Sequence, residues 1–118
     1  AIAIDPKHPD IIYVGTGEGN PRNSQTSGYG IYKSYDGGTN WELLGLEETR
    51  TIHRIIINPE NTDEIFVGAT GVAWGEGPRG VFKSMDGGMT WKKSLFIDSK
   101  TGAGDLVMDP SNPKKLIA

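Results

Sequence analysis

The sequence predicts an all-β protein made of β-propeller blades, and the main reason is an internal repeat. Two nearly identical eight-residue words, SYDGGTNW (34–41) and SMDGGMTW (84–91), lie 50 residues apart. A second word recurs in step with them, because Asx-Pro pairs begin at Asp5, Asn58 and Asp109. Tandem units of about 40–50 residues with four short strands each are typical of propeller blades. We therefore expect blades of four antiparallel strands, about two and a half of them.

Each repeat contains four strand-like segments in the same order. The first ends at the Asx-Pro pair, where proline cannot continue a ladder of sheet hydrogen bonds. The second and third are rich in β-branched and aromatic residues, as strands are. The expected segments are AIAID and RIIIN, IIYVGT and EIFVGAT, GIYKS and GVFKS, and a fourth strand starting at Trp41 or Trp91. Longer loops join the second strand to the third, at 17–30 and 71–80.

These segments divide the chain into a blade at 1–52, a blade at 53–103 and the start of a third blade at 104–118. A β-sandwich would also have short, regularly spaced strands, but it would not explain the sequence repetition. Propellers usually close into rings of about four to eight blades. We expect the missing partners to be the remaining blades of a longer chain or, as the alternative, other copies of this chain.

Composition excludes several classes of function. The net charge is −3 and the pI is about 5.3, whereas a nucleic-acid-binding domain is usually basic. No run approaches the roughly 18 apolar residues of a membrane span. The chain has no Cys, so a thiolate metal site is excluded, and we expect no metal and no cofactor. It opens on AIAI without a basic region before it, so no signal peptide is expected in these residues.

The two words are expected to shape hairpins rather than to perform chemistry. An Asp side chain accepts hydrogen bonds from backbone N–H groups just after it, and glycine adopts positive φ at little cost. A calcium-binding EF-hand loop also contains DG, but it needs further acidic ligands and a closing Glu that are missing here. The second word has Thr90 where the first has Asn40, which we expect to loosen one turn hydrogen bond. The predicted structural residues are Ser34, Asp36, Gly38, Trp41, Ser84, Asp86, Gly88, Thr90 and Trp91.

Antiparallel strand order places the words on one face of the propeller and the long loops on the other. Binding residues usually lie on loops held by a rigid scaffold, so the long-loop face is where function is expected. The catalytic candidates there are Glu18, Glu76 and Asp98. The ligand-binding candidates are Arg22, Asn23, Arg50, His53, Arg54, Trp74 and Arg79, with Asn20, Gln25, Glu47, Glu48, Lys100 and Asp105 nearby.

These residue types suit a sugar. A tryptophan ring stacks on a pyranose, paired carboxylates perform glycosidic acid–base chemistry, and arginine holds an acidic group. Each residue also has a simpler interpretation: exposed Glu and Lys often only solvate a surface, and His53 and Arg54 could tie adjacent blades together.

The words resemble the Asp-box, or bacterial neuraminidase repeat, and the runs YVGTGEGNPRNS and TGAGDLVMDPSNP resemble bacterial sortilin-like, glycosyl-hydrolase-like repeat proteins. This resemblance implies a secreted, periplasmic or envelope-associated propeller. It implies a scaffold that binds protein, peptide or glycan; the alternative is a glycoside hydrolase, sialidase-like or xyloglucanase-like, with acid–base carboxylates partly on other blades. A purely structural role in a surface assembly is a third possibility.

Overall fold

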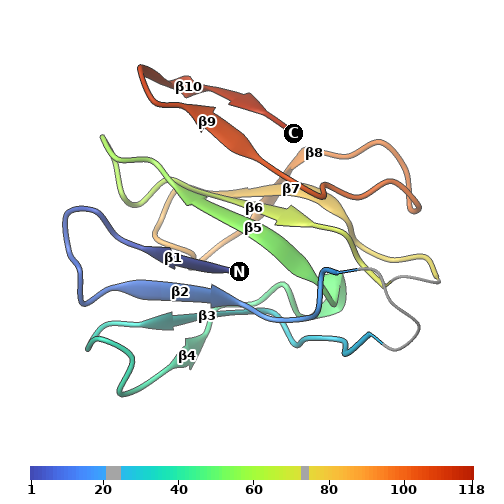
Figure 1. Ribbon diagram of the computed structural model, residues 1–118, viewed down its shortest axis with the longest axis horizontal. Helices are drawn as coiled ribbons and strands as arrows, with labels where there is room; N and C mark the ends of the chain where they lie inside the picture. The colour runs from blue at the N-terminus through green and yellow to red at the C-terminus, as the bar shows by residue number, and fades with distance from the viewer. Residues whose placement is uncertain (21–24, 73–74) are drawn as a thin grey trace.

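The computed structural model describes residues 1–20, 25–72 and 75–118, which form three antiparallel β-sheets (Figure 1). The first sheet has the order β1-β2-β3-β4, the second β5-β6-β7-β8, and the third pairs β9 with β10. The strands are β1 (Ile2–Ile4), β2 (Ile12–Gly15), β3 (Ile31–Ser34), β4 (Glu42–Leu43), β5 (Ile52–Ile57), β6 (Ile65–Ala69), β7 (Gly80–Ser84), β8 (Lys92–Leu95), β9 (Val107–Asp109) and β10 (Asn112–Ile117). The all-β fold class, with blades of four antiparallel strands, is confirmed.

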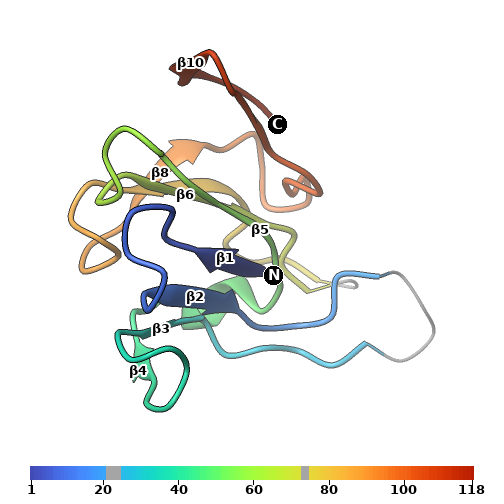
Figure 2. The same cartoon turned by 60° about the vertical axis from the view of Figure 1, so that its left-hand side comes forward.

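The sheets lie side by side in chain order, and the second sheet separates the first from the third in both views (Figures 1 and 2). The first two sheets also repeat the same register. Tyr13 is paired with Lys33 in the first sheet, and Phe66 is paired with Lys83 in the second. Equivalent positions of the two blades can therefore be compared directly.

Alternation along the strands produces two hydrophobic cores, one on each face of the second sheet. Because successive side chains of a strand point to opposite faces, Ile65 and Val67 pack toward the first sheet, while Phe66 packs toward the third. The first core includes Tyr13 and Ile31, both almost fully buried. The second core joins Phe66 to residues that precede or belong to β9 and β10.

The two words form matching hairpins at the end of the sheets opposite the long loops (Figure 1). In the second word, Ser84 Oγ accepts from the amide of Gly88 at 2.8 Å, and Asp86 Oδ1 accepts from the amide of Thr90 at 2.9 Å. The first word makes the same bonds. Gly37, Gly38, Gly87 and Gly88 all have positive φ, which explains the paired glycines.

The expected loosening at Asn40 is wrong. Its side-chain Nδ2 donates to Asp36 Oδ2 at 2.7 Å, in the place where the Thr90 hydroxyl donates to Asp86 Oδ2 at 2.5 Å. The Asn side chain thus has a donor within reach of the same carboxylate oxygen as the Thr hydroxyl. Both turns keep the full set of bonds to the Asp carboxylate.

The strand limits differ slightly from those expected. The fourth strands begin at Glu42 and Lys92, one residue after each tryptophan, because the tryptophan still belongs to the hairpin turn. β5 begins at Ile52, the last residue of the predicted first blade, and so contains His53 and Arg54 rather than starting beside them. A short 3-10 helix, η1 (Glu47–Thr49), lies in the connection between the first two sheets.

Candidate functional site

The long-loop face carries a cavity of about 470 Å³ where the loop after β2, the start of β5 and the loop after β6 meet. Five of the residues singled out from the sequence line it, from segments far apart in the chain. Its described lining residues are Glu18, Gly19, Asn20, Gln25, Thr51, His53, Thr70, Gly71, Val72, Arg79 and Gly104. We call it the loop-face cavity.

His53 links β5 to the first long loop. Its ring nitrogen Nε2 lies 2.7 Å from the carbonyl oxygen of Gly19. A Cβ added at Gly19 would lie 2.2 Å from the same nitrogen, so the loop can approach the imidazole this closely only with glycine there. His53 therefore connects the two sheets at this point, as its simpler interpretation suggested, while it also lines the cavity.

Arg79 is buried, with 6% of its surface exposed, and it ties the loop between β6 and β7 to the connection between β8 and β9. Its Nη2 donates to the carbonyls of Val72 at 3.0 Å and Gly75 at 2.5 Å, and its Nη1 donates to the carbonyl of Lys100 at 3.0 Å. Its Nε is buried without a hydrogen-bond partner among the described residues. The planar, multi-donor guanidinium is the group best suited to such a junction.

The first long loop is ordered from within by polar contacts. The amide of Glu18 donates to the carbonyl of Thr26 at 2.9 Å, and the Gln25 side-chain amide donates to the carbonyl of Asn20 at 2.9 Å. Gly28 holds the end of the loop that leads into β3, because its amide donates to the carbonyl of Arg50 at 2.6 Å. These bonds hold Glu18, Asn20 and Gln25 around one opening.

A second cavity, of about 760 Å³, lies beside the connection that contains η1. Glu47, Glu48 and Arg50 line it together with Tyr29 and Lys93. The acidic side chains and Arg50 therefore occupy a different hollow from Glu18 and His53. The sequence did not indicate that the candidates would separate into these two groups. The short helix η1 sets Glu47 and Glu48 apart, and three residues are too few to show a helical pattern in the sequence.

Other predicted residues lie away from the loop-face cavity. Asp98 closes a turn, since its Oδ1 accepts from the amides of Lys100 at 2.8 Å and Thr101 at 2.7 Å, and these bonds lower its pKa. Arg54 pairs with Asp105 at 2.9 Å on an exposed part of the surface. Glu76 is exposed and does not line the cavity. Arg22, Asn23 and Trp74 fall outside the described residues.

Several lining residues were not predicted. Thr51 lies just before β5 and Thr70 lies just after β6, and the amide of Thr70 donates to the carbonyl of Thr51 at 3.1 Å. Gly104 lies on the connection to the third sheet. Nothing in their residue types indicates a site. They line the cavity because the blade connections converge there.

Asp36 and Asp86 are fully exposed carboxylates on the opposite face. Hydrogen bonds from the backbone and side chain of Asn40 lower the pKa of Asp36 to about 2, and those from Thr90 lower the pKa of Asp86 to about 2. Both carboxylates are thus held ionised by their own turns, as a structural role requires. Among the described residues, no group of three or more His, Cys, Asp or Glu could hold a metal ion.

The loop-face cavity offers neutral and charged hydrogen-bonding groups, with Glu18 as the single carboxylate among its described lining residues. Glycoside hydrolysis generally needs two carboxyl groups, about 5–10 Å apart depending on the stereochemistry. The described part of this cavity therefore offers hydrogen-bonding groups but does not contain a complete pair of carboxyl groups.

Comparison with known proteins relates this partial propeller to glycoside hydrolases. No protein-family model matches the chain. It is 28% identical to a xyloglucanase of Hypocrea jecorina (strain QM6a) and 28% identical to a xyloglucanase of Paenibacillus sp., in each case over 95% of this chain. It spans only 13% and 11% of the lengths of those two enzymes.

Solved structures give the same relationship. An ancestral GH74 enzyme matches 98% of the chain with a TM-score of 0.74 and 26% identity, and the chain covers 15% of that enzyme. The GH74 enzyme of Niastella koreensis matches 94% of the chain with a TM-score of 0.63 and 25% identity, and 17% of it is covered. The comparisons thus favour the glycoside hydrolase alternative over the sortilin-like binding scaffold. No helix in the described part of the chain is long and apolar enough to cross a membrane.

Proposed function

We propose that this chain is a segment of a β-propeller glycoside hydrolase that acts on xyloglucan or a closely related β-glucan. The observation that carries the proposal is the similarity to two xyloglucanases along 95% of the chain. The converging polar residues of the loop-face cavity support it, because they lie where a propeller presents its loops to a ligand.

In this proposal the loop-face cavity binds neutral sugar units. Asn20 and Gln25 supply amide donors and acceptors, and His53 presents a ring to the cavity from β5. Arg79 acts as a positioning residue, because its bonds to three carbonyls fix the surrounding loops. Trp74, expected from the sequence to stack on a pyranose, remains a prediction.

Glu18 is the carboxylate that this segment would contribute. It lies in the cavity, whereas Asp98 is engaged in a turn and Glu76 does not line the cavity. The second carboxyl group required for hydrolysis would come from another blade. A substrate as large as a plant polysaccharide also favours secretion of the protein, as the sequence resemblance implies.

The test is release of reducing ends from xyloglucan by the longest protein that contains this segment. We expect Glu18→Gln to lower kcat at least about 100-fold, the usual contribution of acid–base catalysis, while Asp98→Asn leaves kcat within about twofold. Undiminished kcat in Glu18→Gln would remove Glu18 from the reaction. Binding without release of reducing ends would instead favour a scaffold.

A further inference from the structure

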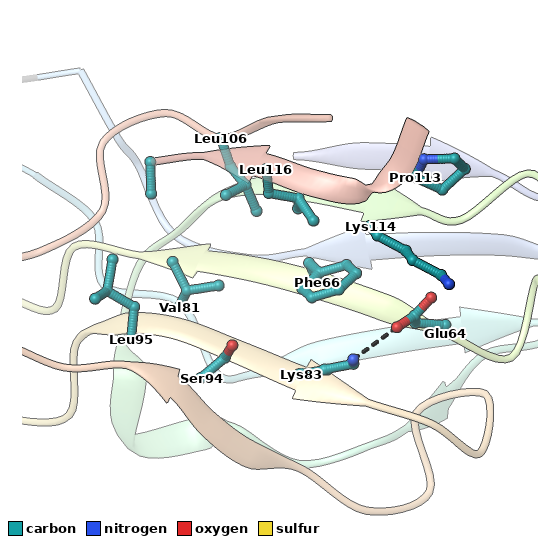
Figure 3. A pocket seen from close by; sticks show the side chains of 11 residues that line it. Glu64, Phe66, Val81, Lys83, Ser94, Leu95, Leu106, Pro113, Lys114 and Leu116 are labelled. Atoms are coloured by element: carbon teal, nitrogen blue, oxygen red, sulfur yellow. Dashed lines mark ion pairs between the residues drawn. The ribbon is translucent and has the colours of Figure 1, made fainter. Parts of the chain in front are cut away.

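A groove of about 430 Å³ lies between the second sheet and the β9–β10 pair (Figure 3). Phe66 and Val81 lie on the sheet side of the groove, and Leu106 and Leu116 lie on the opposite side (Figure 3). At one end, Lys83 Nζ pairs with Glu64 Oε1 at 2.6 Å. The groove is part apolar and part polar, and it lies outside the loop-face cavity.

The internal repeat shows what covers the equivalent surface of the first sheet. Phe66 and Lys83 occupy the same register positions as Tyr13 and Lys33. In the first sheet, Tyr13 Oη and Lys33 Nζ both donate to the carbonyl of Gly87, at 3.1 and 3.2 Å. Gly87 belongs to the word of the second blade, so the hairpin of the second blade covers Tyr13 and Lys33 of the first sheet.

The tryptophan of that word makes a third contact. Trp91 Nε1 donates to the carbonyl of Leu44 at 2.9 Å, and Leu44 is buried. The residue 50 positions later is Ser94, which is exposed and lines the groove. Lys33 is buried, whereas its equivalent, Lys83, is only partly buried. The second sheet therefore has the equivalent surface, but among the described residues no word packs on it as the second word packs on the first sheet.

A fourth contact lies within each blade. The amide of Gly37 donates to the carbonyl of Asp10 at 2.9 Å, and the amide of Gly87 donates to the carbonyl of Asp63 at 3.0 Å. The corresponding residue after the third Asx-Pro pair is Lys114, which also lines the groove.

We propose that this groove is the docking site of a β-hairpin carrying a further copy of the word, with the pattern S-x-D-G-G-x-x-W, supplied by a longer form of this polypeptide. Its glycine carbonyl accepts from Lys83 Nζ, its tryptophan N–H donates to the carbonyl of Ser94, and its glycine amide donates to the carbonyl of Lys114. All three residues line the groove. This inference does not depend on the enzymatic activity proposed above.

The free edge of β10 favours a hairpin over a second copy of the folded chain. Among the described residues β10 pairs with β9 alone, so its other edge can accept a new strand. In a second copy, β3 is already paired with β2. If the word of that copy lay in the groove, its β2 would occupy the position already held by β10, so the two chains would overlap.

The experiment appends a copy of residues 70–95 after Ala118, which places the hairpin at high effective concentration. We expect Tm to rise by at least about 5 °C over the 118-residue chain, a shift typical of roughly 1–2 kcal/mol in a domain of this size. The same fusion with Trp91→Ala in the added copy alone should lose most of that gain. In hydrogen exchange, the glycine amide of the added word should be protected in the first fusion.

Equal Tm values for the two fusions, with no protection of the added glycine amide, would overturn the proposal. Lys83→Met provides the independent check, because it should lower Tm more in the fusion than in the 118-residue chain. A dimer of the 118-residue chain that the added hairpin disperses would show that a second copy occupies the groove, and would also overturn the proposal.

Discussion

The indole Nε1 of Trp91 donates to the backbone carbonyl of Leu44 at 2.9 Å, across the boundary between the second and first sheets. Trp41, at the same place in the first word, instead donates within its own hairpin, to the carbonyl of Gly38 at 2.9 Å. Two residues in equivalent words therefore make different contributions to the fold.

This difference predicts unequal effects of removing the indole N–H. We expect Trp91→Phe to lower the free energy of unfolding by about 1–2 kcal/mol, because it leaves the buried carbonyl of Leu44 without its donor. Trp41→Phe, the matched control, should cost less than about 1 kcal/mol, since Trp41 is 43% exposed. Urea denaturation of both variants measures the difference, and equal losses would contradict the assigned role of Trp91.

The lowered pKa values of Asp36 and Asp86 predict a loss of stability in acid. Each carboxyl has a pKa of about 2 in the folded chain against an ordinary value of 3.8. A depressed folded-state pKa contributes stability that is present above 3.8 and is lost as the pH falls toward 2. Thermal unfolding between pH 5 and pH 2 should show this decline.

The acid decline should be shallower in the double variant Asp36→Asn and Asp86→Asn, which has no carboxylate to protonate in either turn. Some slope will remain, because hydrogen bonds also lower the pKa of Asp98 and Asp109. An unchanged slope would mean that the two words do not contribute to the pH dependence.

The first long loop is predicted to depend on Gly28. A Cβ added there would lie 2.3 Å from the backbone nitrogen of Gly17, so neighbouring backbone has to move. We expect Gly28→Ala to cost about 1–3 kcal/mol of stability and to disorder the loop around Glu18. Gly104→Ala is the control, because an added Cβ meets no atom within 4 Å. Comparable losses in the two variants would refute the close approach.

Arg79 is predicted to hold the loops of the second blade in place. Arg79→Met would leave the carbonyls of Val72, Gly75 and Lys100 without their donor, and should lower stability by about 2–4 kcal/mol. Hydrogen exchange should increase near those residues before global unfolding. Lys100→Met removes a nearby charge but keeps the acceptor carbonyl, so it should have little effect.

The repeat words were enough to predict the blades, their strand order and the hairpin role of Asp36 and Asp86. This was possible because turn chemistry and strand alternation are local properties. The site was less predictable. Which loop residues converge depends on how the blades pack, so Glu18 and His53 could not be grouped, or separated from Asp98, before the geometry was known.

The substitution at Asn40 shows the same limit on a smaller scale. A consensus comparison treats it as a loss, whereas its amide reaches the carboxylate of Asp36 at 2.7 Å. The choice between a binding scaffold and a hydrolase likewise came from relatives, because the described cavity contains a single carboxylate.

The most direct test of the account is a titration of the ¹⁵N-labelled chain with a xyloglucan oligosaccharide, followed by backbone amide shifts. We predict saturable shifts at Gly19, Thr51, His53, Gly71 and Gly104, which surround the loop-face cavity, and none at the hairpin glycines Gly37 and Gly87. Absence of saturable shifts, or shifts centred on the hairpin face, would contradict the claim that this cavity binds β-glucan.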